Sequence, residues 1–237
     1  MQSIILAGGL GTRLRPLTHK TPKCMTLINN KPFLEYQLLL LKKQGINSIL
    51  LCVAYLHEQI QNYFGDGKKW GLTLQYSVEE QPLGTGGALK KAQVLLQDRF
   101  LLLYGDSYLP IAYKDIITAF TSSKKKGLMV VYDNHDTHDT KNNVRVEQGE
   151  VKSYDKKEPR KDFNGVEAGV LVFKKEIIDL MPPQESFSLE EEIFPKLIQQ
   201  NQMGAFMIRQ KFYDIGTVRR LKDAEKILTN EPKTRLP

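Results

Sequence analysis

A cluster of glycines and cations follows the first apolar stretch of the chain and has the residue types that bind phosphate. The stretch is Ser3–Ala7, and residues 6–23 read LAGGLGTRLRPLTHKTPK. Gly8, Gly9 and Gly11 allow a sharp turn that exposes backbone N–H groups. Backbone donors and nearby cations are what a triphosphate requires. The spacing matches neither a Walker loop nor a G-x-G-x-x-G fingerprint. We predict a phosphate site; a structural turn with solvated arginines is the alternative.

A second glycine-rich turn separates a predicted strand from a predicted helix. Residues 79–88 read EEQPLGTGGA, between the alternating strand Leu72–Val78 and the helical stretch Thr85–Leu96. The free N–H groups of a helix N-terminus favour an anion or a carbonyl-rich base. This turn therefore predicts contact with the base of a nucleotide. The alternative is an ordinary capped helix start.

Two aspartates follow predicted strands. Asp106 comes directly after Arg99–Gly105, which reads RFLLLYG, and Asp214 lies in residues 213–217, YDIGT. A carboxylate that emerges from the end of a central strand is well placed to hold Mg²⁺. Taken singly, Asp106 could be a turn residue and Asp214 could belong to the start of a helix.

Glu167 and Gly169 lie inside the predicted strand Gly165–Phe173. A glycine within a strand often marks the close approach of a ligand or of another backbone. A glutamate between Val166 and Val170 needs a polar partner, because burying an unpaired charge is costly. The two residues are therefore candidate contacts for a polar ligand.

Strand-length apolar stretches alternate with helix-length amphipathic stretches along the chain. This order is typical of an α/β fold with a mostly parallel sheet covered by helices. Open sheets of this kind bind ligands at the carboxyl ends of their strands, where the first glycine turn falls. The other predicted strands are Ser48–Val53, Leu128–Tyr132, Val144–Glu147, Glu150–Tyr154 and Met203–Arg209, and the other predicted helices are Pro32–Gln44, His57–Phe64, Tyr113–Lys125, Ile177–Leu180, Ser188–Gln199 with a Ser188/Glu191 capping box, and Thr217–Leu228.

The pattern changes after residue 133, where the chain becomes polar and irregular. Two short strands then flank Gln148-Gly149 and predict a hairpin. We interpret residues 1–230 as one domain, with about 134–173 as a small β elaboration on it. Residues 231–237 are polar and predict a flexible tail.

Composition limits the partners. The chain has 237 residues, a net charge of +7, and 41% hydrophobic and 26% charged residues. The positive balance favours anionic partners, but the cations are spread along the chain, which argues against nucleic acid.

We expect no membrane span and no signal peptide, hence a cytoplasmic protein. The two cysteines predict no disulfide framework. The oligomeric state stays open, a homo-oligomer included.

The first glycine turn carries a family resemblance. Its motifs resemble the signature of sugar-1-phosphate nucleotidyltransferases, and the later motifs extend the resemblance over nearly the whole chain. It implies a three-layer, Rossmann-like α/β fold with the β elaboration over the sugar site. The motifs are Gly8-Gly9-x-Gly11-Thr12-Arg13-Leu14, Pro16-Leu17-Thr18 and Pro22-Lys23.

The resemblance also implies roles for individual residues. Arg13 would clamp the triphosphate, Lys23 would contact the phosphates at the reacting centre, and Asp106 with Asp214 would hold Mg²⁺. Arg13, Lys23 and Asp106 are thus the expected catalytic residues. Cys24 stands where the family often has proline, and we interpret it as a packing residue. The expected nucleotide-binding residues are Leu6, Ala7, Gly8, Gly9, Gly11, Thr12 and Arg13, with Gly84, Thr85 and either Glu79 or Glu80 at the base.

At the sugar end the sequence departs from the family pattern. Lys157 matches the lysine of the family's Phe-x-Glu-Lys motif, which binds the sugar phosphate, but Lys156 replaces the preceding glutamate. Lys156 either serves a substrate with an additional polar or acidic group or is a solvated surface lysine. Glu167 and Gly169 match an Asn-Ala-Gly segment that contacts the sugar, with Glu167 in place of the asparagine.

The resemblance implies nucleotidyl transfer from a nucleoside triphosphate to a sugar 1-phosphate. The overall texture is most similar to bacterial heptose 1-phosphate and mannose-1-phosphate guanylyltransferases, which predicts GTP as the donor and a surface-polysaccharide precursor as the product. Uridylyl, thymidylyl, cytidylyl and phosphocholine-type relatives are alternatives. So are a non-catalytic regulatory subunit and a glycosyltransferase, although Gly105-Asp106-Ser107 does not form the Asp-x-Asp motif of the latter.

Overall fold

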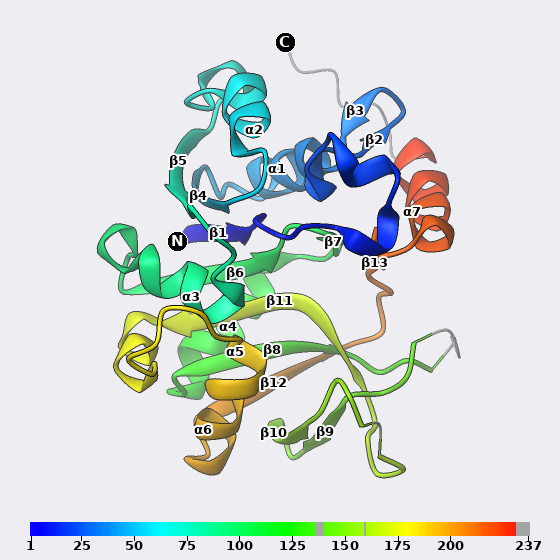
Figure 1. The fold of residues 1–237 in the computed structure, drawn as a ribbon. Helices are drawn as coiled ribbons and strands as arrows, with labels where there is room; N and C mark the ends of the chain where they lie inside the picture. The colour runs from blue at the N-terminus through cyan, green and yellow to red at the C-terminus, as the bar shows by residue number, and fades with distance from the viewer. Residues whose placement is uncertain (136–139, 159, 231–237) are drawn as a thin grey trace.

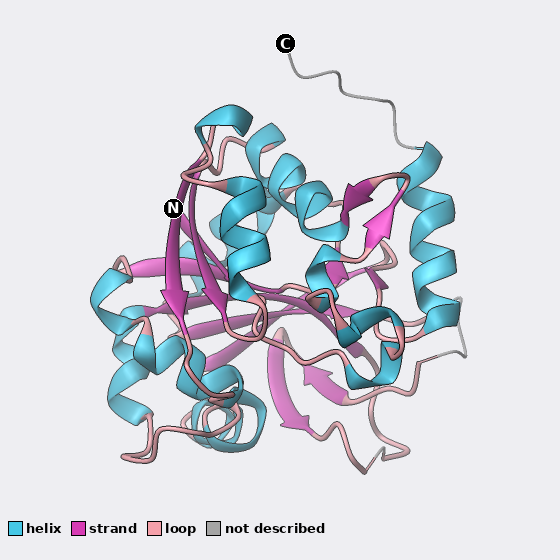
Figure 2. Ribbon diagram, turned by 45° about the horizontal axis from the view of Figure 1, so that its top comes forward, coloured by secondary structure: helices cyan, strands magenta, loops and turns pink. Residues whose placement is uncertain are grey.

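The fold is a central sheet between two layers of helices (Figures 1 and 2). The computed structural model describes residues 1–135, 140–158 and 160–230, so the tail expected at 231–237 lies outside it, as do 136–139 and 159 of the expected elaboration. The described residues form nine sheet strands in the order β5-β4-β1-β6-β11-β8-β12-β10-β9. Their bounds are β1 Gln2–Leu6, β4 Ser48–Val53, β5 Thr73–Val78, β6 Arg99–Tyr104, β8 Gly127–Tyr132, β9 Val144–Glu147, β10 Glu150–Tyr154, β11 Val166–Lys174 and β12 Met203–Ile208.

The predicted α/β class and the mostly parallel sheet are confirmed. All the described strands of this sheet run in one direction except β10 and β11. The expected hairpin is present, because Gln148 and Gly149 adopt positive φ angles of 51° and 74° between β9 and β10. Two consecutive positive φ angles match the twist of paired strands, which makes this a compact hairpin turn.

Side chains that alternate along the strands pack into two separate cores, one on each face of the sheet. Ile5 and Leu51 pack with α1 (Phe33–Lys43), α2 (His57–Phe64) and α4 (Tyr113–Ser123). Ile4 and Leu50 point the other way, toward α3 (Gly84–Lys91), α5 (Leu189–Glu192) and α6 (Phe194–Gln199). This period of two is the geometry of a strand buried on both faces. None of the helices described is long and apolar enough to cross a bilayer.

The last helix, α7 (Val218–Asn230), lies beside short strands at one side of the molecule rather than on the central sheet (Figure 1). It packs in a third, smaller apolar cluster that contains Ile28, Tyr108 and Ile215. The short strands beside it are β2 Leu27–Ile28, β3 Lys31–Pro32, β7 Ser107–Tyr108 and β13 Tyr213–Asp214.

Two expected helices are shorter than their apolar pattern suggested. The stretch predicted to run to Leu96 ends as α3 at Lys91 and continues as a separate 3₁₀ turn. The stretch predicted as Ser188–Gln199 is divided into α5 and α6 at Ile193. Pro195 has no N–H for the helical ladder, which explains the second break. The capping prediction is confirmed in part, since Ser188 Oγ accepts the N–H of Glu191 at 3.3 Å.

A crevice opens where the chain changes direction across the sheet. From β1 the chain first builds β4 and β5 on one side, and only later adds β6 on the other. Leu6 is in register with Cys52 and with Tyr104, so three strands end side by side. Gly105, which follows β6, packs closely against the end of β1. A Cβ on Gly105 would lie 2.8 Å from the carbonyl oxygen of Leu6. Such a switch point is where open α/β sheets bind ligands.

The glycines at the start of α3 let a distant loop close over this helix. Phe187 O accepts the N–H of Gly86 at 3.0 Å, and a Cβ on Gly86 would lie 2.2 Å from the Phe187 ring. A Cβ on Gly87 would lie 2.1 Å from the carbonyl oxygen of Glu185. The glycines therefore leave room for residues 185–190 to pack against α3, in addition to shaping the turn before this helix.

We expect Gly87→Ala to destabilise the fold, because its Cβ meets backbone that cannot yield easily. Overpacking of this kind costs about 1–3 kcal/mol, measured as the free energy of unfolding in urea. Gly9→Ala is the control, since nothing lies within 4 Å of its Cβ position, and it should change stability by less than about 0.5 kcal/mol. Helix propensity alone would make Gly87→Ala stabilising, so a stabilised variant would refute the docking role.

Candidate active site

One cavity gathers most of the predicted site residues. It has a volume of about 380 Å³ and lies at the carboxyl ends of β1 and β6. Glu80, Lys157, Glu167, Gly169 and Asp214 are not among its lining residues. The predicted residues that line it are Leu6, Ala7, Gly8, Gly9, Gly11, Thr12, Arg13, Lys23, Glu79, Gly84, Thr85 and Asp106.

The first glycine turn presents its backbone to this cavity. Gly11 has a φ of 62°, and Thr18 Oγ1 donates a hydrogen bond of 2.7 Å to its carbonyl oxygen. A Cβ on Gly11 would lie 2.9 Å from Thr18 Cγ2, so this position requires glycine. In the part of the chain that the structure describes, the N–H groups of Gly8, Gly9 and Leu10 donate to no protein acceptor. They are available to an anion in the cavity.

The two arginines of the turn lie in different places. Arg13 lines the cavity, whereas Arg15 does not. A Cβ on Gly216 would lie 3.5 Å from Arg13 Nη2, so the guanidinium lies between the first turn and the turn after β13. Arg13 makes no ion pair with any residue that the structure describes. Its charge is therefore available to a ligand.

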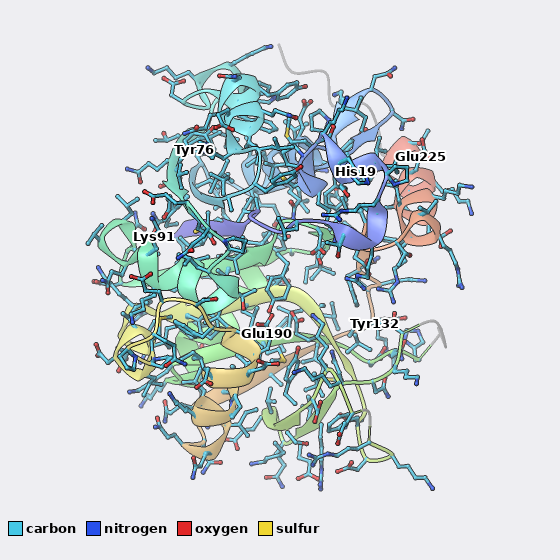
Figure 3. The ribbon with its side chains drawn as sticks, viewed as in Figure 1. His19, Tyr76, Lys91, Tyr132, Glu190 and Glu225 are labelled. Carbon is cyan, nitrogen blue, oxygen red and sulfur yellow. The ribbon has the colours of Figure 1, made fainter. Side chains whose placement is uncertain are left out.

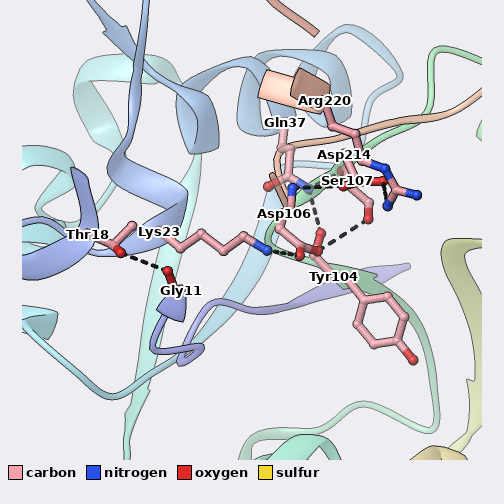
Figure 4. Close-up of polar contacts among 10 residues, drawn as sticks. Gly11, Thr18, Lys23, Gln37, Tyr104, Asp106, Ser107, Asp214 and Arg220 are labelled. Atoms are coloured by element: carbon pink, nitrogen blue, oxygen red, sulfur yellow. Dashed lines mark hydrogen bonds and ion pairs between the residues drawn. The ribbon is translucent and has the colours of Figure 1, made fainter. Parts of the chain in front are cut away.

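Lys23 and Asp106 form an ion pair across the cavity (Figure 4). Burial by itself would raise the pKa of Asp106, but the Lys23 ammonium, helped by Lys156, lowers it below its ordinary value. Asp106 is thus a carboxylate at neutral pH. Gln37 of α1 fixes the backbone around it by donating to the carbonyl oxygens of Tyr104 and Ser107, at 2.9 and 2.6 Å.

Asp214 lies close to Asp106 in the fold, but it lines a second, smaller cavity. It pairs with Ser107 across β13 and β7, one residue from Asp106. Its Oδ1 accepts the N–H of Gly216 at 2.7 Å, and its Oδ2 accepts from Arg220 Nη1 at 2.9 Å (Figure 4). The smaller cavity, of about 140 Å³, is also lined by Arg220. The structure therefore brings the two aspartates to adjacent strands, each already paired with a cation.

The two aspartates have the donor chemistry of a magnesium site. Mg²⁺ prefers oxygen ligands and is usually held by one or two carboxylates, waters and substrate phosphates. Asp106 and Asp214 supply carboxylate oxygens at neighbouring positions. Among the residues described, no cluster of three or more histidine, cysteine or acidic side chains could hold a metal alone. The residues present fit an ion that arrives with phosphate ligands.

Glu79, rather than Glu80, faces the cavity. Glu79 is buried, and its Oε2 accepts the N–H of Leu83 at 3.0 Å. A Cβ on Gly8 would lie 2.9 Å from its Oε1, which explains why Gly8 must lack a side chain. Burial raises the pKa of Glu79 despite the hydrogen bond from Leu83 and the charge of Lys91. Glu80 is exposed and outside the lining.

Glu190 is a cavity residue that the sequence analysis missed. It comes from α5 and lies toward the middle of the molecule (Figure 3). Three hydroxyls donate to it, from Thr85 at 2.5 Å, Ser188 at 2.6 Å and Tyr104 at 2.6 Å. Burial opposes its charge, but these hydrogen bonds lower its pKa. Thr85 and Glu190 are 105 residues apart, so no local signal could have paired them.

Glu167 and Gly169 lie outside the cavity lining, at a register shift in β11. Gly169 has a φ of 78°, and a Cβ there would lie 2.6 Å from Ser107 Cβ, so the side chain of another segment approaches this glycine closely. Glu167 is 6% exposed, and its Oε1 accepts the N–H of Gly169 at 2.7 Å. Burial raises the pKa of Glu167 to about 7, with Lys156 lowering it and Glu190 and Asp106 raising it.

The two lysines of the sugar-phosphate motif are placed differently from the expectation. Lys157 lies outside the cavity with its side chain 80% exposed, and it pairs with Glu191 at 2.5 Å. Lys156 lines the cavity, with Nζ 5.9 Å from the centre of the Tyr104 ring. Lys156 is exposed, as a solvated surface lysine would be, and it also borders the cavity, as a substrate contact would, so both earlier interpretations stay open.

Cys24 also lines the cavity, but its chemistry is that of a packing residue. It is 3% exposed, and burial raises the pKa of its thiol to about 12. A thiol with this pKa is not a nucleophile at neutral pH. The remaining lining residues that were not predicted are Leu10, Pro82, Ala88, Tyr104, Gly105 and Gly216.

Sequence and structure comparisons show which known proteins this chain is similar to. The sequence pattern of the family described as Nucleotidyl transferase matches residues 2–231. The chain is 33% identical to the D-glycero-alpha-D-manno-heptose 1-phosphate guanylyltransferase of Aneurinibacillus thermoaerophilus, over 96% of this chain and 98% of that protein. It is 36% identical to the enzyme of the same name from Campylobacter jejuni, over 91% and 95%. The crystal structure of HddC from Yersinia pseudotuberculosis complexed with GMP-PN has a TM-score of 0.79 and 28% identity, over 96% of this chain and 99% of that one.

The raised pKa of Glu167 predicts a pH-dependent stability. A carboxyl group whose folded pKa is about 7, against an ordinary 4.5, stabilises the fold fully below pH 4.5. That contribution is lost as the pH rises through 7. One pKa unit corresponds to 1.36 kcal/mol, so the loss is about 3 kcal/mol. Glu167→Gln keeps an acceptor for Gly169 and cannot titrate.

Urea unfolding of the ligand-free protein at pH 5 and pH 8 measures this effect. The wild-type protein should lose about 2–3 kcal/mol more than Glu167→Gln over that interval, because part of the full loss already occurs below pH 5. Glu225→Gln, at an exposed position of α7, should follow the wild type. Parallel behaviour of Glu167→Gln and the wild type would show that Glu167 does not titrate in this range.

Proposed function

The chain belongs to the nucleotidyl transferase family, and from that premise we propose that it transfers a guanylyl group from GTP to a sugar 1-phosphate. The products are a GDP-sugar and pyrophosphate. A heptose 1-phosphate is the first acceptor to test, because two guanylyltransferases named for this substrate match over nearly their whole length. The product would then be a precursor of surface polysaccharide.

The observation that carries this proposal is the composition of the main cavity. Free backbone N–H groups of the first turn, Arg13 and Lys23 meet at the ends of β1 and β6. Asp106 and the turn after β13 close the same space. Preorganised donors and cations of this kind stabilise charge that develops on transferred phosphoryl groups. The smaller cavity at Asp214 and Arg220 contains no residue of the first glycine turn.

In the proposed reaction, an oxygen of the sugar phosphate attacks the α-phosphorus of GTP. The new P–O bond forms as the bond to the β-phosphate oxygen breaks, and pyrophosphate leaves with the electron pair. No general base is needed, because the nucleophile is already an anion. The barrier comes from bringing two anions together, and Arg13 and Lys23 offset it by placing positive charge at the phosphates.

A divalent ion, Mg²⁺ in the first instance, fits the same proposal. Asp106 and Asp214 would hold it, and it would supply further positive charge for the triphosphate. Lys23 and Arg220, which now pair with these carboxylates, hold their orientation. The two free cysteines are both buried, and free thiols agree with a reducing compartment such as the cytoplasm.

The choice of guanine is supported by Glu79. Its Oε2 is satisfied by Leu83, whereas its Oε1 lies beside Gly8 at the cavity wall. Guanine presents two neighbouring donors, N1–H and the 2-amino group, and a carboxylate can only accept. Uracil and thymine present a single N–H between two carbonyls. A carboxylate at this place therefore favours guanine.

The direct test is pyrophosphate release from a matrix of nucleoside triphosphates and sugar 1-phosphates. We expect turnover to be highest with GTP and a heptose 1-phosphate. Glu79→Gln replaces one acceptor by a donor and should reduce the preference for GTP over UTP by about 10- to 100-fold, the value of a charged hydrogen bond.

Glu80→Gln, one residue along and exposed, is the matched control and should keep the preference. A wild-type protein that prefers UTP or dTTP would contradict the guanine assignment. A wild-type protein that releases no pyrophosphate with any pair would overturn the proposed activity and favour a non-catalytic nucleotide-sugar-binding role.

Arg13 and Arg15 provide a second test within one turn. Arg13→Ala removes a cation from the cavity and should lower kcat/KM by about 10²–10³, as removal of one preorganised charge partner does. Asp106→Ala should have a similar effect. Arg15→Ala, outside the cavity lining, should stay within about threefold of the wild type. Equal losses in the two arginine variants would argue against a specific role for Arg13.

A further inference from the structure

We propose that Lys156, and not its neighbour Lys157, binds the phosphate of the sugar 1-phosphate in this chain. The inference rests on the proposed function and adds a specificity-determining residue to it. Its basis is the different placement of two consecutive lysines, one inside the cavity and one outside.

A tight turn after β10 separates the two side chains. The N–H of Asp155 donates to Asn143 O at 2.9 Å, which anchors the end of the strand. Asp155 Oδ1 then accepts the N–H groups of Lys157 and Glu158, at 2.8 and 2.9 Å. An aspartate side chain that accepts the backbone N–H groups two and three residues further along the chain forms a defined turn. The backbone that carries both lysines is thus held by three hydrogen bonds.

Lys157 is engaged on the outside of this turn. Its Nζ lies 2.5 Å from Glu191 Oε1, and both side chains are largely exposed. Glu191 is the residue next to Glu190 on α5, but its side chain does not line the cavity. To reach a substrate, Lys157 would have to leave Glu191 and cross the turn. The pair is weak by itself, because it is solvated, but it marks the direction of the side chain.

Lys156 is exposed as well, but it differs from Lys157 in that it borders the cavity. It lines the cavity beside Tyr104 and, among the residues described, has neither an ion pair nor a hydrogen bond. Its charge lowers the pKa of both Asp106 and Glu167, so the ammonium lies near both carboxyl groups. A cation at a cavity wall without a protein partner is suited to an anionic ligand.

The other groups on this side suit a sugar rather than its phosphate. Glu190 accepts a hydrogen bond from the Tyr104 hydroxyl, and Glu167 accepts the backbone N–H of Gly169. Carboxyl oxygens of this kind can also accept from the hydroxyls of a sugar. The Tyr154 hydroxyl, close enough for Glu167 to affect its pKa, is buried without a partner among the described residues. Arg13 and Lys23 lie at the first turn, where the triphosphate is proposed to bind. Lys156 is then the cation left for the second phosphate.

The test is a charge series at Lys156, read as KM for each substrate separately. With GTP saturating, Lys156→Ala should raise KM for the sugar 1-phosphate by about 10- to 100-fold, the value of a hydrogen bond to a charged group. Lys156→Glu should raise it further, and Lys156→Arg should stay within a few-fold. KM for GTP should change by less than about twofold.

Lys157→Ala tests the neighbouring lysine. We expect KM for the sugar 1-phosphate to rise in Lys156→Ala and not in Lys157→Ala. Lys152→Ala, at an exposed position of β10, is the control and should leave both KM values unchanged. A rise in KM for the sugar 1-phosphate in Lys157→Ala but not in Lys156→Ala would overturn the proposal. So would an equal rise in KM for GTP, which would place Lys156 at the nucleotide.

Direct binding separates this proposal from the proposed function. D-glycero-D-manno-heptose 1-phosphate is titrated calorimetrically into the wild type and the variants, with the unphosphorylated heptose as the comparison. We expect Lys156→Ala to lose the preference for the phosphorylated sugar. If this loss is seen but the wild type releases no pyrophosphate, the proposed function fails and the role of Lys156 stands. An undiminished preference in Lys156→Ala contradicts the role whatever the turnover.

Discussion

The ion pair between Lys23 and Asp106 connects the two parts of the chain that build the site. Lys23 belongs to the segment after β1, and Asp106 follows β6, which pairs with β1 on the side away from β4. The pair can form only at the point where the strand order changes direction. It holds the glycine turn over the crevice and keeps Asp106 ionised although burial opposes its charge. The turn, the carboxylate and the cavity between them depend on this contact.

Close backbone packing provides the second constraint. Gly8 leaves room for Glu79, Gly105 for the end of β1, and Gly169 for Ser107. In each case a side chain or strand end from elsewhere occupies the space that a Cβ would need. The glycines therefore act less as flexible points than as places where two segments meet. Their contacts hold the polar groups of the site in fixed positions, which electrostatic catalysis requires.

The cavity divides its charges between two sides. The first turn contributes free N–H groups and Arg13, which suit a triphosphate. The opposite side contributes Glu190, Glu167 nearby and Lys156, which suit hydroxyl groups and one further phosphate. This division matches a reaction between a nucleotide and a phosphorylated sugar. It also explains how Lys156 is accommodated at the cavity, because the carboxyl groups around it balance its charge.

The sequence by itself predicted most of the elements, the class of fold and the cavity position of the first glycine turn, because these depend on local patterns. The motif around Gly8 to Lys23 and the turn from Glu79 to Thr85 lie at strand ends, and their position could be read from periodicity alone. Only the tertiary structure decided between Glu79 and Glu80, added Glu190 to the cavity and separated Lys156 from Lys157. These depend on which segments meet across more than a hundred residues and on the direction of single side chains, and neither is encoded in local spacing.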